Sequence, residues 1–367
     1  MSKNLMLQCR RGARLLTVSA LCAFFSVTAQ AKWQNPADRY KDAYKEYTDA
    51  TCPIRQDHIK NFVYFSRGRN QIRNHSLLTN SNFQGAQIMY SWAQLETSKD
   101  HYDFSIIKED YEYLKAHGKK LFIQLQDATF NPNYKAVPKY LLSDEYNGGA
   151  VYQYVDGDNP KSKPEGWVAR RWDKKVQKRF ALLLAALGKE FDGKIEGINL
   201  QETAIGVSPK TEPTFTPESY VEGLKANMLA MKTAFPHSTT MQYANFMPGE
   251  WLPWEDKGYL KDIYSYGEKI GVGLGGPDLM FRKRSQLNHS LAMMHEHEYT
   301  APLGIAVQDG NYIGQTNTTK VVANHKNIVP QLHAFAKNFL NVDYIFWVNQ
   351  KPYFKTDVLS CMPAKSS

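Results

Sequence analysis

Eight short β-like runs alternate with longer helical patterns along this chain of 367 residues. Strands that alternate with helices indicate a parallel sheet, and eight such units suit one closed barrel better than two domains. The other arrangement considered, an open doubly wound sheet, lacks support because no G-x-G-x-x-G follows a strand. The sequence therefore predicts an α/β protein, a single (β/α)8 TIM barrel. The predicted strands are residues 62–65, 86–90, 120–125, 195–200, 240–244, 272–274, 303–307 and 344–348.

Helical patterns fill most of the space between these runs. The longest break between them, residues 131–172, follows the third strand and has a loop-like content of Gly, Asp, Pro and Tyr. A loop of this length is unusual unless it is functional, so we expect it to cover part of a cleft on the active face. The predicted helices are residues 106–117, 172–191, 217–234, 257–270, 290–299 and 319–338.

The first 31 residues have the pattern of a secretory signal. Their only charges are positive, an apolar run covers residues 15–27, and Ala29-Gln30-Ala31 supplies a small-x-small cleavage site. The apolar run is too short for an ordinary membrane-spanning helix. We therefore expect a signal peptide at 1–31, an N-terminal extension at 32–51 and the barrel at 52–367. The mature protein is predicted to be exported, to the periplasm or the extracellular space, without a membrane segment.

Loss of the signal would lower the formal charge from +9 to +5, because the segment carries four basic residues and no acidic one. The remaining lysines are scattered, and no nucleic-acid-binding motif is present. We therefore expect no nucleic-acid partner and no cofactor, whereas an acidic polymer substrate remains compatible with the charge. The sequence leaves the oligomeric state undefined.

Two cysteines, Cys52 and Cys361, remain in the mature chain and lie near its opposite ends. In an oxidising compartment a pair of cysteines is more often bridged than free. A closed barrel brings its first and last elements side by side, so we predict a Cys52–Cys361 disulfide. Two unrelated buried thiols are the alternative.

The segment 197–206, G-I-N-L-Q-E-T-A-I-G, ends the fourth predicted strand in a carboxylate, Glu202. In a (β/α)8 barrel, functional residues collect just after the strands. The other predicted strand ends also carry acids, amides and large aromatic residues. Such a rim suits sugars, whose hydroxyl groups need fixed hydrogen-bond partners and whose C–H faces stack on flat rings. The candidates beside Glu202 are Trp92, Asp127, Asn199, Gln201, Tyr243, Asn245, Asp278, Gln308, Asp309 and Trp347.

Several of these candidates also have a purely structural interpretation. Glu202 can be a cap or surface acid of the next helix, Asp309 lies in a turn-like Q-D-G-N, and Asp278 follows Gly-Gly-Pro. Trp347 is flanked by Phe346 and Val348, which fits a core position. The cluster H-E-H-E at 295–298 lacks the H-E-x-x-H spacing of a metal site, and consecutive helical residues point in different directions, so we interpret it as a solvated helix end and expect no metal.

One unit of the chain resembles a known family. The run Y-S-W-A-Q-L-E at 90–96, followed by Y-D-F at 102–104 and a helix that ends at His117-Gly118, resembles the second β/α unit of clan A glycoside hydrolases. The β-galactosidase-like members are the most similar. The resemblance covers most of the mature chain as architecture, but only this unit is specific in sequence.

The resemblance implies a retaining glycosidase with its acid/base after strand four, its nucleophile after strand seven and a tryptophan floor after strand eight. Carried over, these are Glu202, Asp309 and Trp347. The chain departs from the clan in two ways. Gln201 replaces the usual Asn before the acid/base, and strand seven ends in Gln308-Asp309 without a Glu. If Gln308 occupies the position of the clan's nucleophile, this chain lacks the nucleophile.

The leading hypothesis is a secreted glycoside hydrolase that uses Glu202 and Asp309. Trp92, Asn245 and Trp347 would hold the sugar, and Asp278 or Asp127 is a substitute base. A carboxyl separation of about 5–5.5 Å would indicate retention, and about 6.5–9.5 Å inversion. The alternative is a carbohydrate-binding barrel without catalytic activity, which the missing Glu after strand seven favours. A metal-dependent hydrolase lacks a strand-end His cluster.

Overall fold

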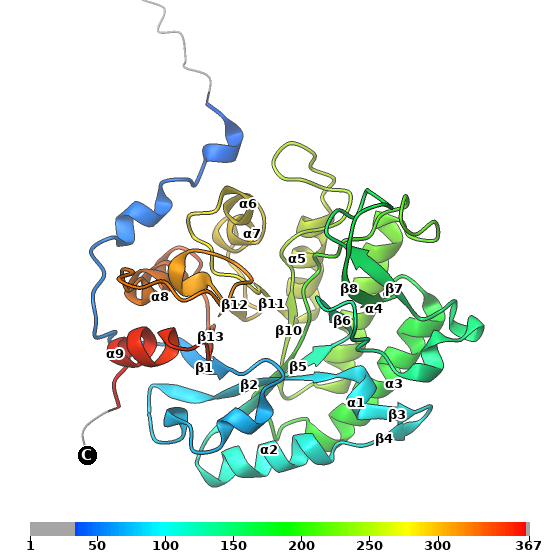
Figure 1. Ribbon diagram of the computed structural model, residues 1–367, viewed down its shortest axis with the longest axis horizontal. Coiled ribbons are helices and arrows are strands. Elements are labelled where there is room, and N and C mark those ends of the chain that lie inside the picture. Colours follow the sequence, from blue (N-terminus) through cyan, green and yellow to red (C-terminus); the bar gives the residue numbers. More distant parts are fainter. Residues whose placement is uncertain (1–33, 365–367) are drawn as a thin grey trace, which may run out of the picture. The chain divides into compact units, whose positions relative to one another are not determined.

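The computed structural model describes residues 34–364, and these form a closed barrel of eight parallel strands (Figure 1). The predicted signal peptide, residues 1–31, lies outside the described residues. The prediction of a (β/α)8 barrel is confirmed, and so is each of the eight predicted strands. In order around the barrel the strands are β1 (Lys60–Tyr64), β13 (Tyr344–Val348), β12 (Leu303–Val307), β11 (Gly273–Gly276), β10 (Thr239–Tyr243), β9 (Gly197–Leu200), β5 (Lys120–Gln126) and β2 (Phe83–Ser91).

Aromatic side chains fill the inside of the barrel. The rings of Phe62, Phe122 and Phe346 meet there, with centroids 4.9–5.9 Å apart. Two strands carry glycine opposite these rings. A Cβ on Gly197 would lie 2.8 Å from the Phe122 ring, and one on Gly304 would lie 3.3 Å from the Phe346 ring. The barrel closes around large rings because these facing positions have no side chain.

Helices surround the barrel, and local signals set most of their ends. Helix α4 begins at its predicted residue because Thr216 and Ser219 form a capping box and Pro217 occupies the first turn. Helix α8 begins at Val329 instead of residue 319, because a longer helix would hold Pro330 in its interior. The helices are α1 (Trp92–Leu95), α2 (Ser105–Ala116), α3 (Lys174–Phe191), α4 (Pro217–Ala234), α5 (Tyr259–Ile270), α6 (Arg284–Asn288), α7 (Ser290–His295), α8 (Val329–Asn338) and α9 (Leu359–Cys361).

The long segment after β5 folds into an antiparallel sheet of three strands, which the sequence did not predict. Its strands are β6 (Ala128–Thr129), β7 (Ala150–Tyr154) and β8 (Pro164–Ala169). Figure 1 shows this sheet in green, at the upper side of the barrel. The amide of Tyr154 donates a hydrogen bond of 2.8 Å to the carbonyl of Gly206. The sheet is thus fastened to the loop that follows β9. A two-stranded sheet, β3 (Glu96–Ser98) with β4 (His101–Tyr102), follows α1.

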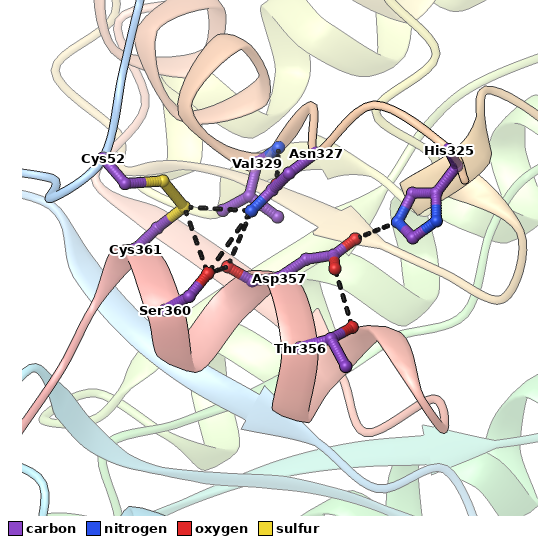
Figure 2. The surroundings of a disulfide bond; sticks show 8 residues. All are labelled: Cys52, His325, Asn327, Val329, Thr356, Asp357, Ser360 and Cys361. Carbon is purple, nitrogen blue, oxygen red and sulfur yellow. Dashed lines mark hydrogen bonds and ion pairs between the residues drawn. A yellow bond between two sulfur atoms is a disulfide. The ribbon is translucent and has the colours of Figure 1, made fainter. Parts of the chain in front are cut away.

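The predicted Cys52–Cys361 disulfide is present and joins residues that are 309 positions apart in the sequence. Figure 2 shows it at the end of α9, with the amide of Asn327 directed at the sulfur of Cys361. The amide of Ile54 donates a 2.7 Å hydrogen bond to the carbonyl of Cys361. Together these contacts hold the two ends of the barrel domain at one place, next to the β1–β13 pair that closes the barrel.

The cluster at residues 295–298, which was predicted to be a solvated helix end, contacts other segments at the surface. Helix α7 ends at His295, whose Nδ1 lies 2.7 Å from the carbonyl of Phe339, and Glu296 forms an ion pair with Arg39. Within residues 34–364, no group of three or more His, Cys, Asp or Glu side chains is arranged to hold a metal ion. No helix in the same part of the chain is both long and apolar enough to span a membrane.

Candidate active site

A cleft of about 660 Å³ lies at the ends of the barrel strands. Its walls come from loops that follow β5, β9, β10, β11 and β12, and from the β7–β8 hairpin. These are the loops at the carboxyl end of the barrel, where functional residues of this fold collect. The residues that line it with chemically useful side chains are Phe130, Tyr154, Glu165, Glu202, Asn245, Phe246, Asp278, Lys283, Gln286, Gln308, Asp309, Thr316 and Asn317.

Glu202 lies in this cleft, two residues after the end of β9. Burial, and to a smaller extent the negative charge of Asp278, raise its pKa to about 7. The amide of Asn245, just beyond β10, donates a 2.7 Å hydrogen bond to Oε2 of Glu202 and opposes this shift. A carboxyl group with this pKa is partly protonated at neutral pH, which is the state that a general acid needs. Glu202 and Asn245 thus lie in the cleft as predicted.

The buried side chain of Arg171 binds the backbone of Glu202. Its Nη1 donates 2.8 Å hydrogen bonds to the carbonyl of Glu202 and to the hydroxyl of Tyr220. Its Nε and Nη2 bind both carboxylate oxygens of Asp127, at 2.8 and 2.7 Å. Asp127 is therefore the buried partner of Arg171 and does not line the cleft, which corrects its prediction as a substrate ligand or base. The sequence reasoning missed Arg171, because it lies at the end of a segment predicted as loop.

Asp278 and Asp309 enter the cleft from the loops after β11 and β12. Asp278 accepts a 3.0 Å hydrogen bond from the amide of Asn311. Burial raises the pKa of Asp278, which the nearby Lys283 opposes, and burial also raises the pKa of Asp309. Both Asp309 and Glu202 raise the pKa of the buried Tyr64, at the end of β1, through their negative charge. Glu202 and Asp309 thus share one cleft and one buried neighbour.

Gln308 also lines the cleft, and its backbone amide donates a 2.8 Å hydrogen bond to Oδ1 of Asn311. The same Asn311 side chain donates to Asp278. One asparagine therefore sets the positions of the loops after β11 and β12. Asn311 lies at the end of the seventh predicted strand, two positions after Asp309, but was not among the candidate site residues.

Three predicted sugar ligands lie beneath the cleft instead of in it. Gln87 donates hydrogen bonds to Oδ1 of Asn199, at 2.9 Å, and to the hydroxyl of Tyr243, at 3.1 Å, inside the barrel. Oε1 of Gln201 accepts hydrogen bonds from the backbone amides of Asp127 and Ala128. These contacts satisfy buried polar groups between strands. Asn199, Gln201 and Tyr243 therefore order the strand ends that carry the site.

Both tryptophans that were predicted to hold the sugar are core residues, with 0% exposure. Trp92 packs against Phe180, and its indole N–H donates a 2.7 Å hydrogen bond to Glu96. Trp347 donates a 2.8 Å hydrogen bond from its indole to Asn61. Side chains alternate along a strand, and since Phe346 faces the barrel interior, Trp347 faces the helical layer. Neither ring is available to a sugar.

Other aromatic rings do reach the cleft. Phe130, Tyr154 and Phe246 line it, and Phe130 is 49% exposed. Trp251 is 51% exposed and stacks on Phe246, with ring centroids 5.7 Å apart and an angle of 11° between the planes. Exposed rings beside a polar cleft are suited to the C–H faces of sugars. The aromatic density of residues 246–254 was a sequence signal for this loop, but it lies beyond the strand ends where the prediction looked.

Glu165 is a further carboxylate that the sequence reasoning missed. It comes from β8, lines the cleft, and has a pKa raised by burial. Its negative charge also contributes to the raised pKa of Glu202. Because the β7–β8 hairpin was not predicted, no sequence signal placed this residue near the strand ends.

Comparison with known proteins adds information on the fold. No protein family matches the sequence, and none of the curated proteins does. Among solved structures, the catalytic domain of β-amylase from Paenibacillus polymyxa matches with a TM-score of 0.55 and 10% identity, over 84% of this chain and 100% of that one. GH5_18 from Bifidobacterium longum subsp. longum matches with a TM-score of 0.50 and 12% identity, over 80% and 70% of the two chains. This chain therefore shares its TIM-barrel fold with these two proteins.

Proposed function

We propose that the protein is a glycoside hydrolase that cleaves O-glycosidic bonds of an oligo- or polysaccharide with two carboxyl groups. Glu202 is the general acid and Asp309 is the second carboxylate. The observation that carries the proposal is the position of Glu202. It has a pKa of about 7, it lies in a cleft at the carboxyl end of the barrel, and two further aspartates share that cleft. Glycosidic hydrolysis requires one protonated and one ionised carboxyl group.

In the first step, the proton of Glu202 passes to the leaving oxygen as the bond between that oxygen and the anomeric carbon breaks. A carboxylate oxygen of Asp309 bonds to the anomeric carbon. In the second step, Glu202 takes a proton from water, the hydroxyl bonds to the anomeric carbon, and Asp309 is released. The charge of Asp278 favours the protonated form of Glu202 before the first step. This two-step course, with retention of configuration, follows the resemblance to clan A.

The rings at the cleft supply the binding surface in this proposal. Phe130, Tyr154 and Phe246 line the same space as the carboxylates. Stacking orients the sugar ring, while amide groups such as those of Asn245 and Gln308 bind its hydroxyl groups. The binding energy thereby holds the scissile bond near Glu202, which is the positioning that the reaction needs.

A direct test measures new reducing ends from a panel of polysaccharides and aryl glycosides, with wild type and Glu202→Gln. Wild type is expected to release them, and Glu202→Gln is expected to lose activity on unactivated substrates by about 100- to 10,000-fold. Glu190→Gln, a change of the same size on the surface of α3, serves as the control. Glycan binding without any release of reducing ends would contradict the proposal.

We also propose that the protein is exported. The disulfide Cys52–Cys361 supports this, because disulfides persist in oxidising compartments. Sequencing of the N-terminus of the protein purified from its native host is expected to begin at Lys32. A mature protein that still begins at Met1 would contradict export by cleavage of the predicted signal.

A further inference from the structure

A second cavity, of about 740 Å³, adjoins the cleft. It is formed by residues 279–283, which follow β11, and by residues 311–316 and 322–328, which follow β12. Lys283 and Thr316 line both the cavity and the cleft. The cavity therefore lies at the same end of the barrel as the carboxylates, and the two spaces share part of their walls.

The charged side chains that line this cavity are all basic. They are Arg282, Lys283 and Lys326. His325 also lines the cavity, and no Asp or Glu does. Arg282 lies 4.6 Å from the ring centre of Tyr44 and donates a 3.3 Å hydrogen bond to Gln331. Within residues 34–364, Arg282, Lys283 and Lys326 form no ion pair with a carboxylate. Apart from the attraction between Lys283 and Asp278, which do not form an ion pair, their positive charge is available to a ligand.

Two acidic groups near this cavity, Asp278 and Asp357, are engaged by other side chains, and a third, Asp309, acts through its charge on the cavity-lining Tyr312. Asp278, on the cleft side, accepts a hydrogen bond from Asn311 and interacts with the charge of Lys283. Asp357, behind the cavity, lies 2.5 Å from Nε2 of His325. A concave surface lined by charges of one sign concentrates its electric field and raises the local concentration of ions of the opposite sign.

We propose that this cavity binds an anionic group, a carboxylate or a sulfate, of a polysaccharide whose scissile bond lies in the cleft. The substrate would then be an acidic polysaccharide. This inference rests on the proposed glycosidase function. The cleft itself contains Glu165, Glu202, Asp278 and Asp309, which repel an anion. The anionic group therefore belongs to a sugar beside the bond that is cut, and the sugars within the cleft are neutral.

Binding can be measured by affinity electrophoresis of Glu202→Gln, which keeps the cationic cavity but does not turn over the ligand. The gels contain polymers matched in backbone and different in charge. Polygalacturonate is compared with its fully methyl-esterified form, and carboxymethylcellulose and cellulose sulfate are each compared with hydroxyethylcellulose. We expect at least one anionic polymer to bind about tenfold more tightly than its neutral partner, with a preference that weakens as salt is added. The carboxylate and sulfate pairs show which anion is preferred.

The second step replaces the lysines in the Glu202→Gln background. Lys283→Ala/Lys326→Ala is expected to remove the preference for the anionic polymer, whereas Lys283→Arg/Lys326→Arg keeps it. Lys261→Ala/Lys269→Ala, on α5, changes the net charge equally, away from the cavity, and is expected to have no effect. Equal retention by charged and neutral polymers, retention by no anionic polymer, or equal loss in the α5 control would each overturn the anion site.

The outcome for the anion site can be separated from the outcome for the glycosidase. Release of reducing ends by wild type from neutral polymers alone would leave the glycosidase standing and overturn the anion site. Preferential binding of an anionic polymer, without release from any polymer, would support the anion site and overturn the glycosidase.

Discussion

The environment of Glu202 determines what this residue can do. Burial and the charge of Asp278 raise its pKa, while the hydrogen bond from Asn245 and the charge of Arg171 lower it. The balance, about 7, leaves the group available both as an acid and as a base near neutral pH. In the proposed mechanism the residue changes between these two roles, so its neighbours set the useful pH range.

The pH dependence of kcat/KM provides the first prediction. Above about pH 7 Glu202 loses its proton, so kcat/KM is expected to fall there. Asp278→Asn removes a charge that raises the pKa of Glu202 and should move this decline to lower pH. Asn245→Ala removes a donor to the ionised form and should move it to higher pH. A decline that does not move, or that moves in the same direction in both variants, would contradict the assignment of Glu202 as the titrating acid.

A stability measurement on Glu202→Gln gives the second prediction. A carboxyl group with a raised pKa in the folded state contributes stability below its unfolded pKa, and loses this contribution as the pH rises through its folded pKa. Glu202→Gln should therefore unfold at a higher temperature than wild type above pH 7, and at a similar one near pH 4. Because the cleft is open to water, we expect a gain of about 1–2 kcal/mol at high pH. A constant difference at all pH values would argue against a raised pKa.

At the residue scale, the sequence predicted the acids better than the aromatic residues. Glu202, Asp278 and Asp309 follow strands directly, so counting from the strand ends placed them in the cleft. Trp92 and Trp347 also lie at strand ends, but a shift of one position reverses the face of a strand on which a side chain lies. Trp347 is on the outer face for this reason. Trp92 occupies a short helix, where it helps to bury Glu96.

At the scale of elements, a buried ion pair helps to hold the loop after β5 to the barrel. Arg171, at the end of that loop, reaches Asp127 after β5 and the carbonyl of Glu202 after β9. Three neighbouring segments therefore share a single anchor. The predicted loop was correctly expected to lie at the cleft, but its β7–β8 hairpin was not predicted because its Gly, Pro and Asp content is typical of irregular structure.

Loss of this anchor supplies the third prediction. Arg171→Met leaves the carboxylate of Asp127 buried without its partner, which should lower the free energy of unfolding by about 3–5 kcal/mol. Arg171→Met/Asp127→Asn should recover part of the loss, since no buried charge then remains. Urea unfolding measures both. Arg170→Met is a matched control, because Arg170 is adjacent and pairs with the partly exposed Glu212. A loss for Arg171→Met no larger than for Arg170→Met would mean that the anchor has little energetic importance.

The contrast between well and poorly predicted elements has a physical basis. All eight barrel strands are mostly buried runs, so their pattern was strong. Helix ends with caps, such as the start of α4, were also placed correctly. The predicted start of α8 was wrong. The polar residues of a surface loop resemble those of an exposed helix face, and the prediction did not take into account that Pro330 belongs in the first turn of a helix.

At the scale of the whole molecule, the barrel is closed by the β1–β13 pairing and by a disulfide at the chain ends. The two cysteines were correctly paired from the sequence, since only two remain after the predicted signal. The bond restricts the unfolded chain over a separation of 309 residues. The disulfide is thus expected to stabilise the protein mainly by lowering the entropy of the unfolded chain.

The fourth prediction concerns this disulfide. Cys52→Ser/Cys361→Ser should lower the free energy of unfolding by about 2–5 kcal/mol, without a change in kcat/KM, because the bond lies away from the cleft residues. Thermal unfolding with and without a reductant measures the effect, and the reductant should lower the Tm of wild type but not of the variant. If reduction leaves the Tm of wild type unchanged, the bond does not stabilise the fold.

Two charge regions also define the carboxyl end of the barrel. The cleft is rich in carboxylates, and the adjoining cavity is lined by Arg282, Lys283 and Lys326 and by no carboxylate. This separation could not be predicted from the sequence, because the net charge averages over both regions. Their arrangement becomes visible only when the loops after β11 and β12 are placed beside one another.

The central claim is that Glu202 and Asp309 act as a pair, and kcat/KM of Asp309→Asn on the substrate that wild type cleaves best tests it most directly. The account predicts a loss of about 1,000-fold or more for Asp309→Asn. It also predicts that Asp278→Asn, a matched change in the same cleft, keeps measurable activity. Wild-type activity in Asp309→Asn, together with loss of activity in Asp278→Asn, would contradict the claim and transfer the second role to Asp278.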